Sequence, residues 1–454
     1  MKIWEDDDQV GAEGNGKEHE QYGGGDDYEI EAEPWWRDPA TIPPREFLYG
    51  RHLVRKDISA TIGAGGRAKT TYCLFEAIEM VTARNLTIGK ALPHEPLRVV
   101  YLNAEEDQDE LDRRVAAICK RYRVTEADLG GRLVVKSVRD RPLRLAILKG
   151  GTPILNQPAL NALTTVIERN KADVFILDPW VSFHAVNESS NMDMDLIVKE
   201  GLGAIASKTN SAGEILHHPG KPKPGQAETT VEDARGASAI IWAVRSARVF
   251  NFMTPDEASK LGITEDDRRR HIRITNGKAN MGPLGKAEWI RIEVEDLPNG
   301  DEVAVSSRWS PPNPFDGVST TDMTTGARLA ASGEFRADSR SPDWFGYALA
   351  DHLHIPVAYG ADNDPKDLAR LNAIIKTWIK NKVLKIEVRP DAKSKERKFI
   401  VPGAAAPQAK PTADDRFFSD DEITLQVTGD EDDWRKQSPR GRRYFSSLQF
   451  LQSL

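Results

Sequence analysis

A glycine-rich segment that ends in lysine and threonine has the composition of a loop that holds nucleotide phosphates. The run Gly63-Ala64-Gly65-Gly66-Arg67-Ala68-Lys69-Thr70 follows a short apolar stretch and leads into a helical pattern. Small residues let backbone N–H groups close around phosphate oxygens, the lysine neutralises their charge, and the hydroxyl can bind Mg²⁺. The sequence therefore predicts ATP and Mg²⁺ as cofactors. The residues predicted to contact the nucleotide are Gly63, Gly65, Gly66, Ala68, Lys69, Thr70 and Thr71.

One residue departs from the phosphate-loop pattern. The pattern G-x-x-x-x-G-K-[ST] expects glycine where Ala68 stands. A methyl group is tolerated at this position only if the backbone keeps a negative φ and the phosphate does not press on the Cβ atom. The alternative interpretation is a glycine-rich turn that only caps a helix.

Two acidic residues at the ends of apolar runs are candidates for the chemistry of hydrolysis. Asp178 closes the run Val174–Leu177, so we predict that it holds Mg²⁺ from a strand adjacent to the strand before the glycine-rich loop. A water-activating acid often follows such an aspartate directly, but Pro179 stands here. The general base must therefore come from another strand.

Glu105 is the predicted general base. It follows the apolar run Val99–Leu102, which would set it at the carboxyl edge of a neighbouring strand, facing the γ-phosphate. The alternative is that Glu105 and Glu106 only complement the dipole of the next helix. We favour the catalytic role for Glu105 and the dipole role for Glu106.

Two histidines end another apolar run, at His217 and His218. A polar side chain here could hydrogen-bond the γ-phosphate and report hydrolysis to the loop that follows, and we predict this role for His218, with His217 in packing or support. A metal ligand or a buried core histidine is the alternative. No Cys, His, Asp or Glu stands at ligand spacing, which disfavours the metal.

Arginines further along the chain could act on a neighbouring subunit. Arg235, Arg245 and Arg248 follow the loop 219–234, and a guanidinium donated across a subunit boundary can stabilise transition-state charge. Lys278 is a weaker candidate for the same role. The alternative for each is a solvated or salt-bridged surface residue.

Apolar strand patterns alternate with helical patterns from residue 42 to residue 306, which predicts an α/β fold around a mainly parallel sheet. Segments rich in β-formers, from His271 to Ser306, are expected to extend this sheet at its edge. The predicted buried strands are Ile58–Ile62, Leu97–Asn103, Val174–Asp178, Glu214–His217 and Ala247–Phe252. The predicted helices between them include Thr71–Ala83 and Gln108–Tyr122.

The remaining segments are predicted to be a small domain, a linker and two tails. Residues 307–341 are rich in Ser, Thr, Pro and Gly and are predicted to be a linker. Residues 342–402 read as helix, helix and hairpin with a basic tip, which resembles a winged helix. Residues 1–38 and 403–454 carry too little apolar surface to offset the entropy of ordering, so we expect them to be disordered.

The composition limits the class of protein. The chain has 454 residues and a net charge of −8, which excludes a broadly basic nucleic-acid coat but not a local basic channel. Its two cysteines, Cys73 and Cys119, lie in helical patterns, so neither a disulfide framework nor a zinc site is expected. No apolar run is long enough to span a membrane. We expect a cytoplasmic protein without a membrane partner.

The ordered set of motifs resembles that of the RecA-type hexameric plasmid replication helicases, the RepA-like group of AAA-family ATPases, from about residue 45 to residue 285. The matching elements are 63–71, 101–106, Leu177-Asp178, Phe183-His184, His217-His218 and 235–245. Ala68 departs from the glycine usual in that family.

The resemblance implies a RecA-like P-loop ATPase core and a homo-oligomeric ring, with a hexamer as the expected form, that acts on single-stranded DNA. By position it implies Lys69 and Thr70 on phosphate and Mg²⁺, Glu105 as base, Asp178 as Mg²⁺ acid, His218 as sensor and Arg245 as the finger from the neighbouring subunit. The segments 182–195 and 219–234 would face the channel. The second of these carries Lys221 and Lys223, which suit a phosphate backbone.

Three functions remain open from the sequence. The first is an ATP-driven, ring-forming helicase in the replication of a plasmid, phage or mobile element. The second is a DNA-binding regulatory or initiator protein that recognises duplex DNA through residues 342–402, without unwinding. The third is a nucleotide-dependent switch or kinase with no nucleic-acid partner. Stimulation of the ATPase by single strands and not by duplex would separate the first from the others.

Overall fold

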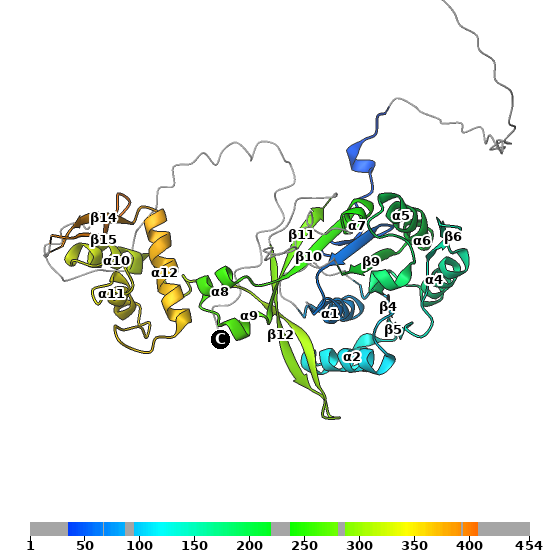
Figure 1. Ribbon diagram of the computed structural model, residues 1–454, viewed down its shortest axis with the longest axis horizontal. Helices are drawn as coiled ribbons and strands as arrows, with labels where there is room; N and C mark the ends of the chain where they lie inside the picture. The colour runs from blue at the N-terminus through cyan, green and yellow to red at the C-terminus, as the bar shows by residue number, and fades with distance from the viewer. Residues whose placement is uncertain are drawn as a thin grey trace, which may run out of the picture. The chain divides into compact units, whose positions relative to one another are not determined.

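The computed structural model describes residues 35–66, 68–86, 95–218, 237–279, 287–391 and 394–406. They form two compact units that divide between Asn313 and Pro314. We call these the first and the second unit (Figure 1). The first unit carries the glycine-rich loop.

A nine-stranded sheet forms the centre of the first unit, in the order β13-β12-β11-β10-β3-β9-β8-β4-β5. The strands from β10 to β5 pair in parallel, whereas β11, β12 and β13 continue the sheet in antiparallel pairs. The strand bounds are β3 Ile58–Ile62, β4 Val99–Asn103, β5 Leu133–Ser137, β8 Val174–Asp178, β9 Ala212–His217, β10 Ser246–Phe252, β11 His271–Ala279, β12 Glu288–Asp296 and β13 Glu302–Trp309.

Helices cover both faces of this sheet. Figure 1 shows α1 and α2 on one side, and α4, α5, α6 and α7 on the other. The helix bounds are α1 Lys69–Thr82, α2 Gln108–Tyr122, α3 Glu126–Leu129, α4 Gln157–Asn170, α5 Asn191–Asp195, η3 Leu196–Gly203, α6 Ala204–Thr209, α7 Ala237–Ala243, α8 Pro255–Leu261 and α9 Glu265–Arg268. Two short hairpins, β1 (Phe47–Tyr49) with β2 (Leu53–Val54) and β6 (Ala146–Lys149) with β7 (Thr152–Leu155), and the 3₁₀ turns η1 (Pro39–Thr41) and η2 (Trp180–Phe183) complete the unit.

The central strands are buried on both faces, and their side chains alternate between two cores. In β3, the apolar residues Ile58, Ala60 and Ile62 pack into the core beneath α4–α7. The helix α1 contributes to the other core, together with side chains of β11, β12 and β13. Since a parallel sheet needs cover on both faces, this two-core arrangement explains the continuous apolar runs in the sequence.

The predicted α/β core with a mainly parallel sheet is confirmed. Two of the five predicted strands, β3 and β8, match to the residue, and the other three differ by one or two residues at one end. The expected β extension at the sheet edge is confirmed by β11–β13. The edge strand β5 was not predicted, because its residues Leu133–Ser137 are only partly buried and lack a strong apolar pattern.

The described part of the second unit contains three helices and a hairpin, in the order α10 (Thr320–Ser332), α11 (Phe345–His352), α12 (Pro365–Lys380), β14 (Leu384–Pro390) and β15 (Glu396–Pro402). Arg336, between α10 and α11, pairs by single β-bridges with Phe399 of β15 and with Trp344. The helices and the hairpin share one apolar core.

The predicted linker at residues 307–341 is wrong in two respects. Strand β13 continues to Trp309, and α10 belongs to the second unit. A capping box between Ser319 and Asp322 begins this helix. A Cβ atom at Gly326 would lie 2.4 Å from the ring of Trp378, so this glycine lets α10 approach α12 closely. The polar composition of the segment concealed a packed helix.

The remaining boundary predictions fall largely outside the described residues. This holds for residues 1–34 of the predicted N-terminal segment and for everything after Ala406 of the predicted C-terminal tail. Both cysteines are free, Cys73 in α1 and Cys119 in α2. Among the helices of the described ranges, none has the length and apolar character needed to cross a membrane.

Candidate nucleotide site at the end of strand β3

The lysine of the glycine-rich loop lies at the centre of the candidate site. The loop leaves β3 and enters α1 at Lys69, whose side chain is buried. The Lys69 Nζ donates to the carbonyls of Gly63 (2.6 Å) and Ala64 (3.2 Å), and lies 3.0 Å from Nδ1 of His218. The ammonium group is therefore held inside the curve of the loop, where phosphate oxygens would be bound in a P-loop.

The loop is open around Gly65 and Gly66. A Cβ atom at Gly65 or Gly66 would meet no other heavy atom within 4 Å, whereas one at Gly63 would lie 2.9 Å from Cβ of Phe250. Gly65 and Gly66 thus keep the loop open, and Gly63 is needed for packing against β10.

Ala68 does not keep the negative φ that we expected. It precedes α1 in the left-handed conformation, with φ 52° and ψ 27°. Gly66, two residues earlier, has φ 73°, which costs glycine nothing. For a residue with a Cβ atom, the left-handed conformation costs about 1–2 kcal/mol. Alanine is therefore strained at the position where the pattern expects glycine.

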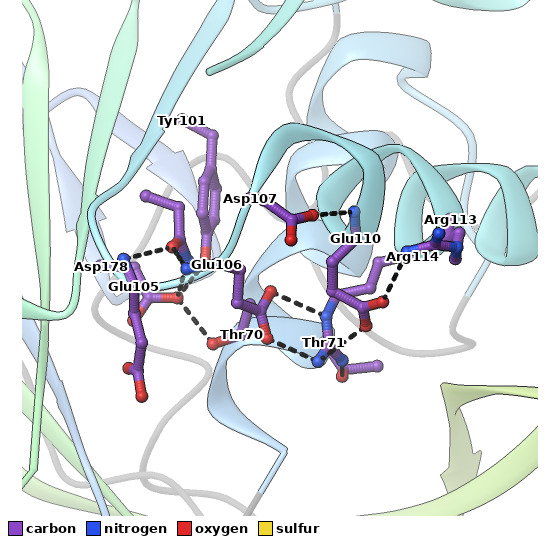
Figure 2. A network of polar contacts seen from close by, with 11 residues as sticks. Thr70, Thr71, Tyr101, Glu105, Glu106, Asp107, Glu110, Arg113, Arg114 and Asp178 are labelled. Carbon is purple, nitrogen blue, oxygen red and sulfur yellow. Dashed lines mark hydrogen bonds and ion pairs between the residues drawn. The ribbon is translucent and has the colours of Figure 1, made fainter. Parts of the chain in front are cut away.

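Asp178 is buried and receives three hydrogen bonds on one oxygen, Oδ2 (Figure 2). The donors are Thr70 Oγ1 at 2.6 Å, Tyr101 Oη at 2.7 Å and Asn103 Nδ2 at 3.2 Å. Burial raises the pKa of Asp178, and the hydrogen bonds from Thr70 and Tyr101 oppose that shift. A hydroxyl and a carboxylate side by side are oxygen ligands of the kind that Mg²⁺ prefers.

The strand that carries Asp178 is not adjacent to β3, contrary to the prediction. Strand β9 lies between β3 and β8 in the sheet. The contact between Thr70 and Asp178 still forms, because Thr70 is in the first turn of α1, which begins above the carboxyl edge of the sheet. Tyr101 and Asn103 of β4 were not predicted as site residues, although they belong to the same strand end as Glu105.

Glu105 lies on the exposed side of this group. Asn103 and Asp178 are paired across β4 and β8, and the side-chain oxygen of Asn103 accepts the N–H groups of Glu105 and Glu106, at 2.9 and 2.7 Å. The carboxylate of Glu105 has no dashed contact in Figure 2 and is exposed. Its backbone is thus fixed close to Asp178, while its carboxylate faces solvent.

Glu106 does not have the helix-dipole role that we predicted. Helix α2 begins after Asp107, which is its N-cap. Both oxygens of Glu106 instead accept from one edge of the Arg114 guanidinium, Nε at 2.8 Å and Nη2 at 2.6 Å, and Nη1 of Arg114 donates to the hydroxyl of Thr71 at 3.0 Å (Figure 2). Burial raises the pKa of Glu106, and Arg114 opposes that shift. This bridge ties the Glu105 segment to α1. Arg114 itself did not stand out in the sequence.

His218 and His217 have different surroundings. His218 lies beside Lys69, and burial, together with the charges of Lys69 and His217, lowers its pKa to about 4. A neutral His218 accepts the Lys69 N–H at Nδ1. His217 is buried at the end of β9, and its Nδ1 lies 3.5 Å from Oε1 of Glu188. Its backbone carbonyl accepts the N–H of Gly63 at 3.2 Å, which joins β9 to the loop.

The candidate residues for action across a subunit boundary separate into two groups. Arg248 is excluded, because it is buried in its own chain and pairs with Glu76 of α1 at 2.7 and 2.5 Å. The Nζ of Lys278 donates to the carbonyls of Ile241 (2.6 Å) and Trp242 (3.2 Å) at the end of α7. The guanidinium of Arg248 and the ammonium group of Lys278 are thus both occupied within the chain.

Arg245 remains exposed and lies far from its own glycine-rich loop. Its side chain is 58% exposed and reaches Asp57 at 3.5 Å. Its N–H donates to the carbonyl of Ile58, the first residue of β3. The glycine-rich loop follows the last residue of β3. Arg245 therefore lies at the other end of this strand, where the parallel strands begin. Arg235, Lys221 and Lys223 lie outside the described residues.

Comparison with known proteins gives one family match that covers the glycine-rich loop, and two similar solved structures. Residues 26–224 match the profile of a protein family described as AAA domain. The chain is also similar to a RadB recombinase crystal structure, with 11% identity, a TM-score of 0.35, and coverage of 53% of this chain and 89% of that one. A DnaB-like replicative helicase, described with its interactions with primase, gives 12% identity and a TM-score of 0.37, with 53% of this chain covered; the match spans 57% of that chain.

The AAA-domain match and the glycine-rich loop together support an ATPase of the P-loop type. Three features of the structure fit a bound nucleotide with Mg²⁺. They are the open space around Gly65 and Gly66, the buried lysine inside the loop, and the hydroxyl beside a buried carboxylate.

Proposed function

We propose that this protein is an ATP-hydrolysing, ring-forming motor that acts on single-stranded DNA. The observation that carries the proposal is the contact of Thr70 with Asp178 beside Lys69. It brings a hydroxyl, a buried carboxylate and an ammonium to one edge of the sheet. Glu105 supplies an exposed carboxylate at the same edge. These are the groups that phosphoryl transfer to water requires.

Each residue would have one task. Thr70 and Asp178 would hold Mg²⁺, which neutralises phosphate charge when bound. Lys69 would exchange its present carbonyl partners for phosphate oxygens. Glu105 would orient and deprotonate the attacking water, and its exposed carboxylate suits that task. His218 would sense the γ-phosphate, because it now contacts Nζ of Lys69, which would bind that phosphate.

The ring is proposed from the place of Arg245. An exposed guanidinium at the opposite edge of the sheet cannot reach the loop of its own chain, but it could reach the loop of a neighbouring copy. A ring, with a hexamer as the expected form, would place one such arginine at each nucleotide site. Replication of a plasmid, phage or other mobile element remains the proposed setting, on the resemblance alone.

The test is the steady-state ATPase rate with and without single-stranded DNA, measured together with molar mass in solution. The proposal expects stimulation by single strands, no comparable stimulation by duplex, and an assembly of several chains. A monomer with a DNA-independent rate would contradict both the motor and the ring.

A second candidate function is duplex DNA binding by the second unit, as in an initiator or regulatory protein. Helix α12 and the β14–β15 hairpin carry exposed basic side chains, and we propose that together they act as a winged helix. They are Lys376, Lys380, Lys382, Lys385, Lys395, Arg397 and Lys398. Such a set suits contacts with a phosphate backbone.

Charge reversal in the full chain tests this candidate. Lys385→Glu with Arg397→Glu should weaken salt-dependent duplex binding and leave the basal ATPase unchanged, because both residues lie in the second unit. Duplex affinity equal to that of the wild type would remove this candidate.

A further inference from the structure

A buried polar cluster lies behind the candidate site and is not used by the proposed chemistry. The side chains of His184 and His217 are each only 2% exposed, and both face one oxygen of Glu188. Nε2 of His184 lies 3.4 Å from Glu188 Oε1, and Nδ1 of His217 lies 3.5 Å from the same atom. Burial raises the pKa of Glu188, but the two histidines outweigh burial and hold that pKa at about 2.

The cluster is incompletely hydrogen-bonded. Both contacts are at ion-pair distance but lack hydrogen-bond geometry. Both ring nitrogens of His184, Nδ1 of His217 and Oε1 of Glu188 are buried without a hydrogen-bond partner among the described residues. Since buried polar groups are nearly always paired, such a group calls for an explanation. One carboxylate oxygen placed between two imidazoles can form a good hydrogen bond with either by a small shift, at the expense of the other.

The three residues lie at or just after the ends of two strands of the site, β8 and β9. His184 and Glu188 lie in the segment after β8, which ends in Asp178, and His217 is the last residue of β9. His217 adjoins His218, which contacts Lys69, and its carbonyl accepts the N–H of Gly63. His217 therefore links Glu188 to the glycine-rich loop.

We infer that Glu188 is a positioning residue that couples the nucleotide loop to the segment following β8. The inference rests on the proposed function, together with the expectation from the sequence that residues 182–195 face the DNA channel. A phosphate that takes over Lys69 removes the partner of His218. The end of β9 then loses one constraint, and Glu188, which now lies between the two histidines, pairs with His184 alone. A metal is not required, because the described residues contain no group of His, Cys, Asp and Glu suited to one.

The main experiment compares the ATPase of the full chain with and without single-stranded oligothymidine. Glu188→Gln should lower the ratio of stimulated to basal kcat to within about twofold of one, with KM for ATP changed by less than about twofold. Glu200→Gln, at an exposed glutamate of η3, should keep the wild-type ratio. A wild-type ratio in Glu188→Gln would overturn the inference, and so would a parallel change of KM and kcat with a large loss of thermal stability.

A second readout does not need DNA. The buried ring of Trp180 lies 4.9 Å from the ring of His184, so a change at His184 should alter its fluorescence. The signal is the ATP-induced change in fluorescence of a given chain minus the change measured in the same chain with Trp180→Phe. It should be present in the wild type and absent in Glu188→Gln, and its persistence in that variant would overturn the inference. If the wild type shows this signal but no stimulation by DNA, the proposed function fails and the coupling stands.

The same contact can be tested from its other side if Glu188→Gln does not fold. His217→Asn and His184→Asn should each reduce the Trp180 signal. Each double variant with Glu188→Gln should lose no more of the Trp180 signal than its single variants do, because both changes interrupt the same contact. Additive losses would show that the residues act independently, against the inference.

Discussion

The hydroxyl of Thr70 donates to Oδ2 of Asp178 over 2.6 Å, although strand β9 separates the strands that lead to them. The contact joins the first turn of α1 to the end of β8, and Tyr101 and Asn103 hold the same oxygen from β4. Three elements thus fix one carboxylate oxygen. A site built in this way is preorganised, so changes at its members should affect nucleotide chemistry more than folding.

Removal of the loop lysine should strongly weaken ATP binding. Lys69→Ala deletes the ammonium that lies inside the loop, so the affinity for ATP should fall by about 10- to 100-fold or more, as expected for loss of a charged hydrogen bond. Binding is measured by titration with a fluorescent ATP analogue. Lys149→Ala, at an exposed lysine of β6, is the matched control. Wild-type affinity in Lys69→Ala would contradict the P-loop interpretation.

Removal of the exposed carboxylate should separate binding from turnover. Glu105→Gln keeps the shape of the side chain but cannot accept a proton, so kcat should fall by about 10²- to 10⁴-fold while ATP still binds. Single-turnover hydrolysis measures this. Wild-type turnover would move the water-activating role to another group.

Glu106→Gln provides the comparison, because this change removes the charge that holds Arg114 but leaves Glu105 in place. Its effect on kcat should be smaller than that of Glu105→Gln. A larger effect would identify Glu106 as the base and leave Glu105 without a role.

The strained alanine should be replaceable with a gain in stability. Ala68 has φ 52°, so Ala68→Gly relieves a cost of about 1–2 kcal/mol, less the 0.5–1 kcal/mol or so of added freedom in the unfolded chain. Denaturant unfolding should show a net gain of about 0.5–1 kcal/mol. Ala116→Gly, at an exposed position within α2, should change stability in the opposite direction, by about 1 kcal/mol. Destabilisation by Ala68→Gly would mean that the methyl group is needed for packing.

The sequence was sufficient for the sheet and for the strand-end residues, for a physical reason. Strands buried on both faces read as continuous apolar runs, and the loops at their carboxyl ends collect the polar groups. Val174–Asp178 is such a run, and it became β8 without a change of bounds. The half-buried edge strand β5 carries no comparable signal.

Pairings between distant residues were not predictable from the sequence. Arg248 and Arg245 are three residues apart, yet the first is buried against Glu76 and the second is exposed at the sheet edge. Arg248 lies within β10 and points to the face that α1 covers, whereas Arg245 stands one residue before the strand begins, and only the packed structure shows this difference. The left-handed backbone of Ala68 was equally hidden, because the rule that favours glycine there states a preference and not a conformation.

Stability should depend on pH through His218. Burial, with the charges of Lys69 and His217, lowers the pKa of His218 to about 4, whereas an unfolded histidine has a pKa of about 6.5. Between these values the unfolded chain binds more protons, so stability falls as the pH falls from 6.5 towards 4. The denaturation midpoint of the wild type should therefore drop more between pH 7.5 and pH 5 than that of His218→Asn.

Glu188 does not disturb this comparison. Its pKa of about 2 adds stability that is lost only as the pH falls below about 4.5, outside the interval used. Equal drops in the wild type and in His218→Asn would show that His218 is protonated with an ordinary pKa in the folded protein.

Mixed assemblies test whether Arg245 acts on a neighbouring copy. Arg245→Ala and Lys69→Ala protomers should each be inactive alone, because each lacks one part of every site. When mixed, some interfaces join an intact loop to an intact arginine, so part of the activity should return. The side chain lies at the edge of the sheet opposite the loop of its own chain, which excludes direct help within one subunit. If assembly of the mixture is confirmed by molar mass and activity does not return, Arg245 does not act across the boundary, and its contact with Asp57 is its structural role.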